Sequence, residues 1–225
     1  MTRFPPRRRV PEFTLFASLL RMATKYGFSD LREQLVKDLK GAYPTKWEDF
    51  ETTSVLGEDV FGLPKPHPNT VLNLFVGQNV RFAIPFAYYR ASIGGFSALM
   101  SDKPGMVLPR DTLARAIYGM GVTQRMMPTT AYAIGYTMNL IVCPDKACML
   151  NVGISPKQQR TEVLRRLSDV MFGERQGGLL SAPSLGGITC GKCRESLKSS
   201  HSAHRRACWG VLPSAFAVAK SWDEL

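Results

Sequence analysis

The sequence predicts an all-α protein, in which a helical hairpin is followed by an irregular multi-helix domain with long loops rich in proline and glycine. Three observations predict this fold class. Apolar residues recur at three- and four-residue spacing, strand-like alternation never persists beyond four residues, and no self-similarity appears at a period of about 20–50 residues. The 225 residues are 44% hydrophobic and 21% charged, so the chain can bury a core.

The first two elements are predicted to form the hairpin. Phe13 to Tyr26 has the periodicity of an amphipathic helix, and Gly27 lies where its C-terminus is expected. Asp30, with Glu33 three positions later, gives an N-terminal capping signal for a second helix that ends near Leu39. We expect the hairpin to pack through five apolar side chains: Leu15, Leu19, Met22, Leu35 and Leu39.

A proline-rich segment follows, from Tyr43 to Asn69. It also carries aromatic residues, which indicates a loop pinned to a core, and we place a boundary here. Trp47 and Trp222 are each expected to be at least half buried, because an indole exposed to water is costly. The predicted parts are a basic N-terminal tail (1–12), the helical hairpin (13–45) and a helical C-terminal domain with Cys-rich segments (46–225).

Further helices are predicted from capping residues and periodicity. Asn69 is predicted to cap one helix, Pro85 to mark a break or a new helix start, and the diglycine at Gly94 to end a helix. An exposed loop is expected over residues 174–187. A long helix is expected from Pro109 to about Thr137, interrupted by Gly119, Gly121 and Pro128. Two further helices are expected from Ser155 to Phe172 and from about Cys193 towards Trp209.

Charge and targeting features restrict the class of protein. The formal charge of +11 favours anionic partners, including nucleic acid, acidic protein surfaces and anionic lipid, without choosing among them. The longest apolar stretch is too short to cross a bilayer, so we expect no membrane association. No apolar segment of signal-peptide type follows the arginines near the start, so we expect an intracellular protein, cytoplasmic or nuclear, with reduced cysteines.

Two cysteine pairs form the candidate metal site. Cys143 with Cys148, and Cys190 with Cys193, each place two thiols on a turn, and four thiolates suit tetrahedral zinc. The hypothesis is a structural zinc. The alternative is ordinary thiols, because the spacing departs from compact zinc ribbons. The reserve ligands are Cys208, His201 and His204.

No catalytic template is present in the sequence. It has no Walker glycine loop, no Gly-x-Ser-x-Gly elbow and no His-Glu-x-x-His motif. We therefore expect no enzyme activity and no organic cofactor. His201 and His204 share a predicted basic helix, where they form either a ligand pair, a phosphate-facing patch or a solvated surface.

Several segments together resemble one family, the BTB/POZ-domain-containing proteins of fungi. Residues 12–45 resemble the last helices of the BTB domain and its exit, and the downstream part resembles the helical region that follows it. The segments that carry the resemblance are Glu12 to Tyr26, Leu31 to Glu33, Ala42 to Thr45, Pro64 to Asn69, the paired cysteines, Trp209 to Phe216, and Ser221 to Leu225.

The resemblance implies a non-catalytic protein–protein interaction module with an unknown protein partner. A complete BTB domain also has an N-terminal helix and the sheet of its dimer surface, which this sequence lacks, so the resemblance implies a truncated member. A homo-oligomer stays open as a partner, although the dimer surface of the BTB domain belongs to the missing part. The alternative function is a basic nucleic-acid-binding protein with a zinc-stapled, Cys-rich C-terminal part, which steep salt dependence of binding would reveal.

Overall fold

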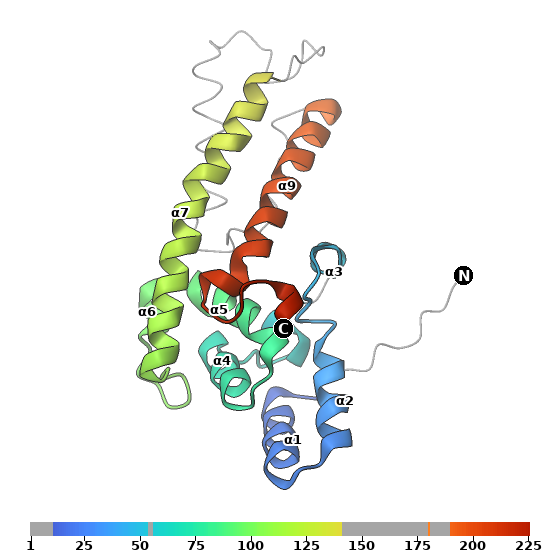
Figure 1. Ribbon diagram of the computed structural model, residues 1–225, viewed down its shortest axis with the longest axis vertical. Coiled ribbons are helices and arrows are strands. Elements are labelled where there is room, and N and C mark those ends of the chain that lie inside the picture. Colours follow the sequence, from blue (N-terminus) through green and yellow to red (C-terminus); the bar gives the residue numbers. More distant parts are fainter. Residues whose placement is uncertain (1–10, 54–55, 141–179, 181–189) are drawn as a thin grey trace, which may run out of the picture. The chain divides into compact units, whose positions relative to one another are not determined.

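We describe a computed structural model, which covers residues 11–53, 56–140, 180 and 190–225 (Figure 1); for residues 127–140, 193, 194, 196 and 197 it describes the backbone alone. All regular elements in these ranges are α- or 3-10 helices, so the predicted all-α class is confirmed. None of the described helices is long and apolar enough to cross a membrane. The expected helix over 155–172 and the expected loop over 174–187 lie outside the described residues.

The chain divides into two compact units. The first comprises Met1–Met120 and Leu212–Leu225, and the second comprises Gly121–Val211. Helices α7 (Arg110–Leu140) and α9 (Gly191–Ala215) each contribute to both units. We therefore describe each unit separately.

The hairpin of the first unit consists of α1 (Phe13–Tyr26) and α2 (Ser29–Leu39), which lie side by side in Figure 1. Gly27 ends α1 with a positive φ of 68°, and its N–H donates to the Ala23 carbonyl, as a glycine C-cap does. The predicted capping role of Asp30 is wrong. Phe28 precedes α2 without a side-chain cap, and Asp30 lies in the first turn, where its charge favours the helix dipole.

The predicted packing of the hairpin is correct for α2 and wrong for α1. Leu35 and Leu39 are buried. In α1, however, Leu15 is 54% exposed and Met22 is 50% exposed, while Leu19 is only partly buried. The face that enters the core is instead formed by four other residues: Phe16, Ala17, Leu20 and Ala23.

The proline-rich loop is pinned to the core, as expected, through α3 (Trp47–Thr52) and the 3-10 helix η1 (Gly57–Phe61). Trp47 is only 6% exposed and Trp222 is partly buried, which confirms both tryptophan predictions. The next helix, α4 (Pro68–Gly77), is capped by His67, whose Nδ1 accepts from the Asn69 N–H at 3.2 Å. The predicted capping role of Asn69 is therefore wrong.

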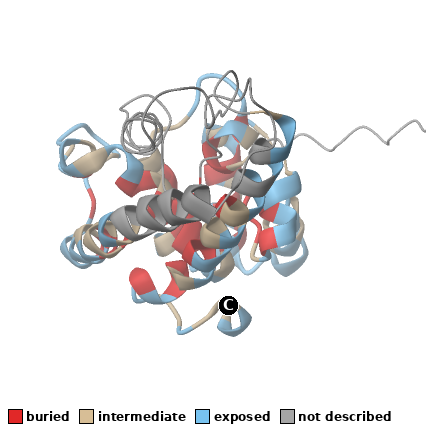
Figure 2. Ribbon diagram, turned by 90° about the horizontal axis from the view of Figure 1, so that it is seen from above, coloured by how far each residue is buried: buried red, intermediate tan, exposed pale blue. Residues whose placement is uncertain are grey.

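The boundaries of the remaining helices of the first unit lie close to the predicted proline and glycine positions. Pro85 lies in the first turn of α5 (Ile84–Ile93), which follows η2 (Arg81–Ala83), and Gly94 ends α5 before α6 (Gly95–Leu99). The core contains edge-to-face aromatic contacts, including Tyr43 with Phe75 at 4.9 Å between ring centroids. In Figure 2 helices carry both buried and exposed stretches, as amphipathic packing requires.

The two long helices run further than predicted. Helix α7 continues through its glycines to Leu140, and α9 extends from Gly191 to Ala215, beyond the expected end near Trp209. Packing within the first unit explains the glycine at position 119, because a Cβ there would overlap the ring of Phe216. Phe216 in turn stacks on Tyr88, with 5.3 Å between ring centroids. A final 3-10 helix, η3, covers Trp222–Glu224.

Candidate functional site

The surface of α1 carries an apolar line of four side chains: Leu15, Leu19, Met22 and Tyr26. We call this line the α1 seam. Leu15, Met22 and Tyr26 are 54%, 50% and 59% exposed, and Leu19 is partly buried. Their 4–3–4 spacing is that of a narrow coiled-coil seam rather than of a wide apolar face. The seam is therefore shaped for contact with another helix.

The seam continues around the turn of the hairpin. Phe28 is 54% exposed, and its ring centroid lies 6.2 Å from that of Tyr26. Leu31, at the start of α2, is 37% exposed. The Tyr26–Phe28 contact thus extends the seam to the turn, and exposed apolar surface of this kind marks interaction sites.

Two apolar lines exist on α1 because its sequence is apolar on more than one side. The line formed by Phe16, Leu20 and Ala23 is buried in the core of the first unit. Phe61 of η1 fixes this orientation, since its ring centroid lies 5.4 Å from that of Phe16 and 5.1 Å from that of Phe13. The core therefore buries the line that contains Phe16 and leaves the seam outside.

The charged groups beside the seam are few. Helix α1 contains Arg21 and Lys25 and no acidic residue. The ammonium of Lys25 lies 5.3 Å from the centroid of the Tyr26 ring, a cation–π contact that covers one end of the seam. Glu12 directly precedes the helix. The middle of the seam, between Leu15 and Met22, is bordered by no acidic side chain of α1 itself.

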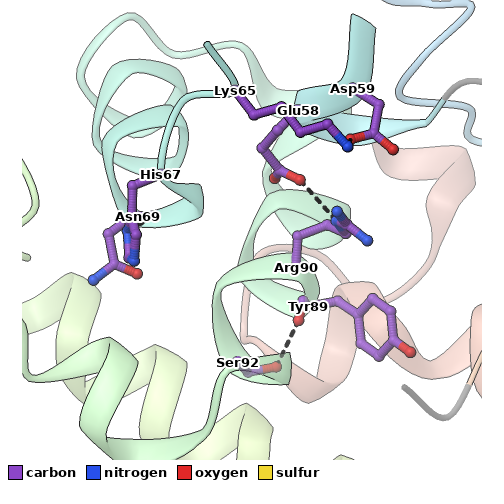
Figure 3. Close-up of polar contacts among 8 residues, drawn as sticks. All are labelled: Glu58, Asp59, Lys65, His67, Asn69, Tyr89, Arg90 and Ser92. Atoms are coloured by element: carbon purple, nitrogen blue, oxygen red, sulfur yellow. Dashed lines mark hydrogen bonds and ion pairs between the residues drawn. The ribbon is translucent and has the colours of Figure 1, made fainter. Parts of the chain in front are cut away.

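A second polar feature of the first unit is a buried ion pair, shown in Figure 3. Arg90 Nε donates to Glu58 Oε2 at 2.8 Å, and only 3% of the Glu58 side chain is exposed. Burial alone would lower the pKa of Arg90, but the adjacent carboxylate raises it above its usual value. Gly57 precedes this pair with a positive φ of 59°, and a Cβ there would lie 3.2 Å from Arg90 Nε. The pair therefore ties η1 to α5.

Tyr43 lies in the electrostatic field of this pair. Its side chain is completely buried, and its hydroxyl has no hydrogen-bond partner among the described residues. Burial, and then the charge of Glu58, raise the pKa of Tyr43 well above its usual value. The hydroxyl therefore stays protonated, and its buried ring acts as a packing group.

Two asparagines of α4 hold the segment between α6 and α7. Asn69 Nδ2 donates to the carbonyls of Ala98 at 2.9 Å and Met106 at 3.1 Å. Asn73 Nδ2 donates to the Val107 carbonyl at 2.8 Å. Side-chain amides that satisfy loop carbonyls in this way have a structural role.

The predicted zinc ligands are only partly covered by the structure. Cys143 and Cys148 lie outside the described residues, and the Cys193 side chain does as well. Cys190 is partly buried and directly precedes α9. In the described part of the chain, no group of three or more His, Cys, Asp or Glu residues is arranged to hold a metal ion. The four-cysteine site stays a prediction.

The reserve ligands lie on α9. His201 and Cys208 are buried at 3% exposure each, and His204 lies one turn after His201. His201 Nε2 has no hydrogen-bond partner among the described residues. Burial, followed by the nearby charges of Arg205 and His204, lowers the pKa of His201 to about 4. This imidazole is therefore neutral at pH 7.

Sequence reasoning missed the α1 seam by assigning three of its members to the hairpin core. The available signal was the number of apolar residues in α1, which is larger than one buried face needs. Comparisons with protein-family models, curated proteins and solved structures found no match to this chain. Any function must therefore be argued from the residues themselves.

Proposed function

We propose that this chain is a non-catalytic protein–protein interaction module of BTB/POZ type, and that the α1 seam is its docking face. The observation that carries the proposal is that Leu15, Met22 and Tyr26 each expose half or more of their surface. They lie in one line on a helix whose other apolar side is buried. The BTB/POZ class rests on the sequence resemblance alone.

The physical argument is the free energy of apolar surface in water. Burying a side chain of this size stabilises a complex by about 1.5–3 kcal/mol when burial is complete, and by roughly half of that when half is already covered. Three half-exposed side chains in one line therefore offer a few kcal/mol to a partner. Scattered surface residues would not combine in this way.

The test is position-specific photo-crosslinking in cells that produce the chain. A benzophenone amino acid replaces Tyr26 on the seam in one variant and Thr14 in the matched control, which is exposed on another side of the same helix. We expect a discrete crosslinked protein from position 26, which is lost when Met22→Glu is added and kept when Lys37→Glu is added. Equal crosslinking from positions 14 and 26, or none from either, would contradict the proposal.

The second candidate, a basic nucleic-acid-binding function, is favoured by the distribution of charge. Residues 121–211 contain 12 basic and five acidic residues, whereas residues 11–120 and 212–225 together contain 13 of each. The basic excess is thus confined to the second unit and to the N-terminal tail. Binding of DNA or RNA that weakens steeply with salt would support this function, and binding insensitive to salt would exclude it.

The structural zinc is proposed as a fold staple of the second unit. If four cysteines hold one ion, binding stabilises the folded state, because the unfolded chain holds the pairs about forty residues apart and has no preformed site. We expect Cys190→Ser to abolish stoichiometric zinc in the purified, reduced protein and Cys208→Ser to retain it. Metal-free wild-type protein whose melting is unchanged by chelator would remove the hypothesis.

A further inference from the structure

Helix α4 begins on a side chain whose hydrogen-bonding capacity depends on pH. His67 and Asn69 both lie at the start of this helix, and His67 Nδ1 accepts from the Asn69 N–H at 3.2 Å (Figure 3). We propose that His67 is an acid-sensitive cap, so that protonation of its imidazole releases the first turn of α4 and, through Asn69, the segment 98–107. This proposal is independent of the α1 seam.

All N–H groups in the first turn of α4 depend on His67. Pro68, the first residue of the helix, has no N–H. The Asn69 N–H donates to the imidazole, while the N–H groups of Thr70 and Val71 donate to the His67 carbonyl at 2.9 and 3.2 Å. A ring nitrogen accepts only when it carries no hydrogen, so the observed contact requires the neutral imidazole with its hydrogen on Nε2.

Protonation of His67 removes this acceptor. Rotation of the ring cannot restore it, because both nitrogens of an imidazolium are donors. Asn69 is 0% exposed, so water cannot replace the lost acceptor unless the turn moves, and a buried N–H without a partner is costly. The imidazolium also places a positive charge at the positive end of the α4 dipole. Both effects favour opening of the first turn.

The charged groups around His67 set the direction of its titration. They are Glu58 of η1 and Lys103 of the segment 98–107; α4 itself contains no charged residue, and the neighbouring Lys65 is paired with Asp59 at 2.8 Å. Partial burial lowers the pKa of His67 from its ordinary value of 6.5, Glu58 opposes this shift, and Lys103 adds to it. The neutral cap therefore prevails at pH 7, and the protonated form requires acid.

Asn69 carries the effect to the segment 98–107. Its Nδ2 donates to the carbonyls of Ala98 at 2.9 Å and Met106 at 3.1 Å, so movement of the first turn withdraws a donor from both ends of this segment. Lys103 lies between them, and its repulsion by the imidazolium is relieved when the segment moves away. We therefore expect local opening of this segment and not unfolding of the whole unit.

The test combines NMR of the full chain, labelled with ¹⁵N in its histidines and amides, with hydrogen exchange from about pH 7.5 to about pH 5. His201, whose pKa is about 4, stays mostly neutral in this range. We expect His67 Nδ1 to carry no hydrogen at the start and to be protonated at the end. The protection factors of the Asn69 and Met106 amides, corrected for intrinsic exchange, should fall roughly tenfold on protonation, and that of Leu35 should not change.

Two variants separate the cap from a general effect of acid. His67→Asn keeps a side-chain acceptor at the N-cap but cannot titrate, so the Asn69 and Met106 amides should stay protected at about pH 5. His204→Asn, the matched control, removes an imidazole of α9 and should keep the wild-type response. Lys103→Gln removes the repelling cation, so the response should move to higher pH.

Four outcomes would overturn the acid-sensitive cap: hydrogen on His67 Nδ1 at about pH 7.5, no protonation of His67 by about pH 5, unchanged protection of Asn69 while His67 is protonated, or an undiminished acid response in His67→Asn. Loss of protection at Asn69 without loss at Met106 would overturn the transmission to the segment 98–107. Parallel loss at both amides, absent in His67→Asn and kept in His204→Asn, is the result that the proposal predicts.

Discussion

The ion pair between Glu58 and Arg90 offers a direct test of the packing in the first unit. Its N–O distance is 2.8 Å, equal to that of the Lys65–Asp59 pair, but the burial of the two pairs differs widely. Side-chain exposure is 33% for Arg90 and 3% for Glu58, against 58% for Lys65 and 43% for Asp59. Two pairs of equal length in one chain therefore isolate the effect of burial.

The perturbation is Arg90→Met, with Lys65→Met as the matched control. Arg90→Met leaves a buried carboxylate without its cation, which costs about 3–5 kcal/mol at a fully buried site. Because a third of the Arg90 side chain is exposed, we expect a loss of about 2–3 kcal/mol. The control breaks an exposed pair, which is worth at most about 1 kcal/mol.

The assay is urea unfolding followed by circular dichroism. With an m value of about 2 kcal/mol/M, Arg90→Met should lower the midpoint by roughly 1 M, and Lys65→Met should lower it by less than about 0.5 M. The double variant Glu58→Gln, Arg90→Met should recover part of the loss because the buried charge is gone. Equal midpoint shifts for the two single variants would refute the reasoning.

Three further predictions concern other buried groups. Tyr43→Phe should leave the melting temperature unchanged or raise it, because it removes a buried hydroxyl without a partner and keeps the ring contacts; a loss above about 1 kcal/mol would show an unrecognised hydrogen bond. Gly119→Ala should destabilise by about 1–3 kcal/mol in thermal unfolding, because the new methyl group overlaps Phe216; a stabilised variant would contradict this packing. The His201 imidazole should titrate near pH 4 by NMR, and titration near pH 6.5 would refute this prediction. Because the pKa of His201 is lower in the folded than in the unfolded state, the free energy of unfolding should fall by up to about 3 kcal/mol as the pH drops from about 6.5 towards 4. His201→Leu should remove this dependence of stability on pH.

Local signals predicted the elements of the hairpin well. Gly27 supplies the positive φ that ends α1, and the periodicity before it gave the helix its observed bounds. Pro85 and Gly94 also act where they were expected, because a missing N–H and a missing side chain have consequences that depend on few neighbours. Such signals need no knowledge of the tertiary fold.

Tertiary packing determined which side chains are buried and which residues cap helices, where local sequence signals did not predict this correctly. Both lines of α1 are apolar, and the line that is buried is the one that contacts Phe61, far along the chain, through Phe16. Asn69 has the chemistry of a cap, but its amide donates to the carbonyls of Ala98 in α6 and of Met106, and His67 caps the helix instead. The glycines of α7 predicted an interruption, yet Gly119 serves to admit the Phe216 ring.

The central claim, that the α1 seam is a covered docking face in the cell, is tested most directly by methionine footprinting with peroxide. Met22 on the seam is 50% exposed and Met100 is 51% exposed, so the two should be oxidised equally in the dilute purified chain. In intact cells that produce the chain, Met22 should be protected while Met100 is oxidised as before, and Leu15→Glu should abolish that protection. Equal oxidation of the two methionines in cells would contradict the account.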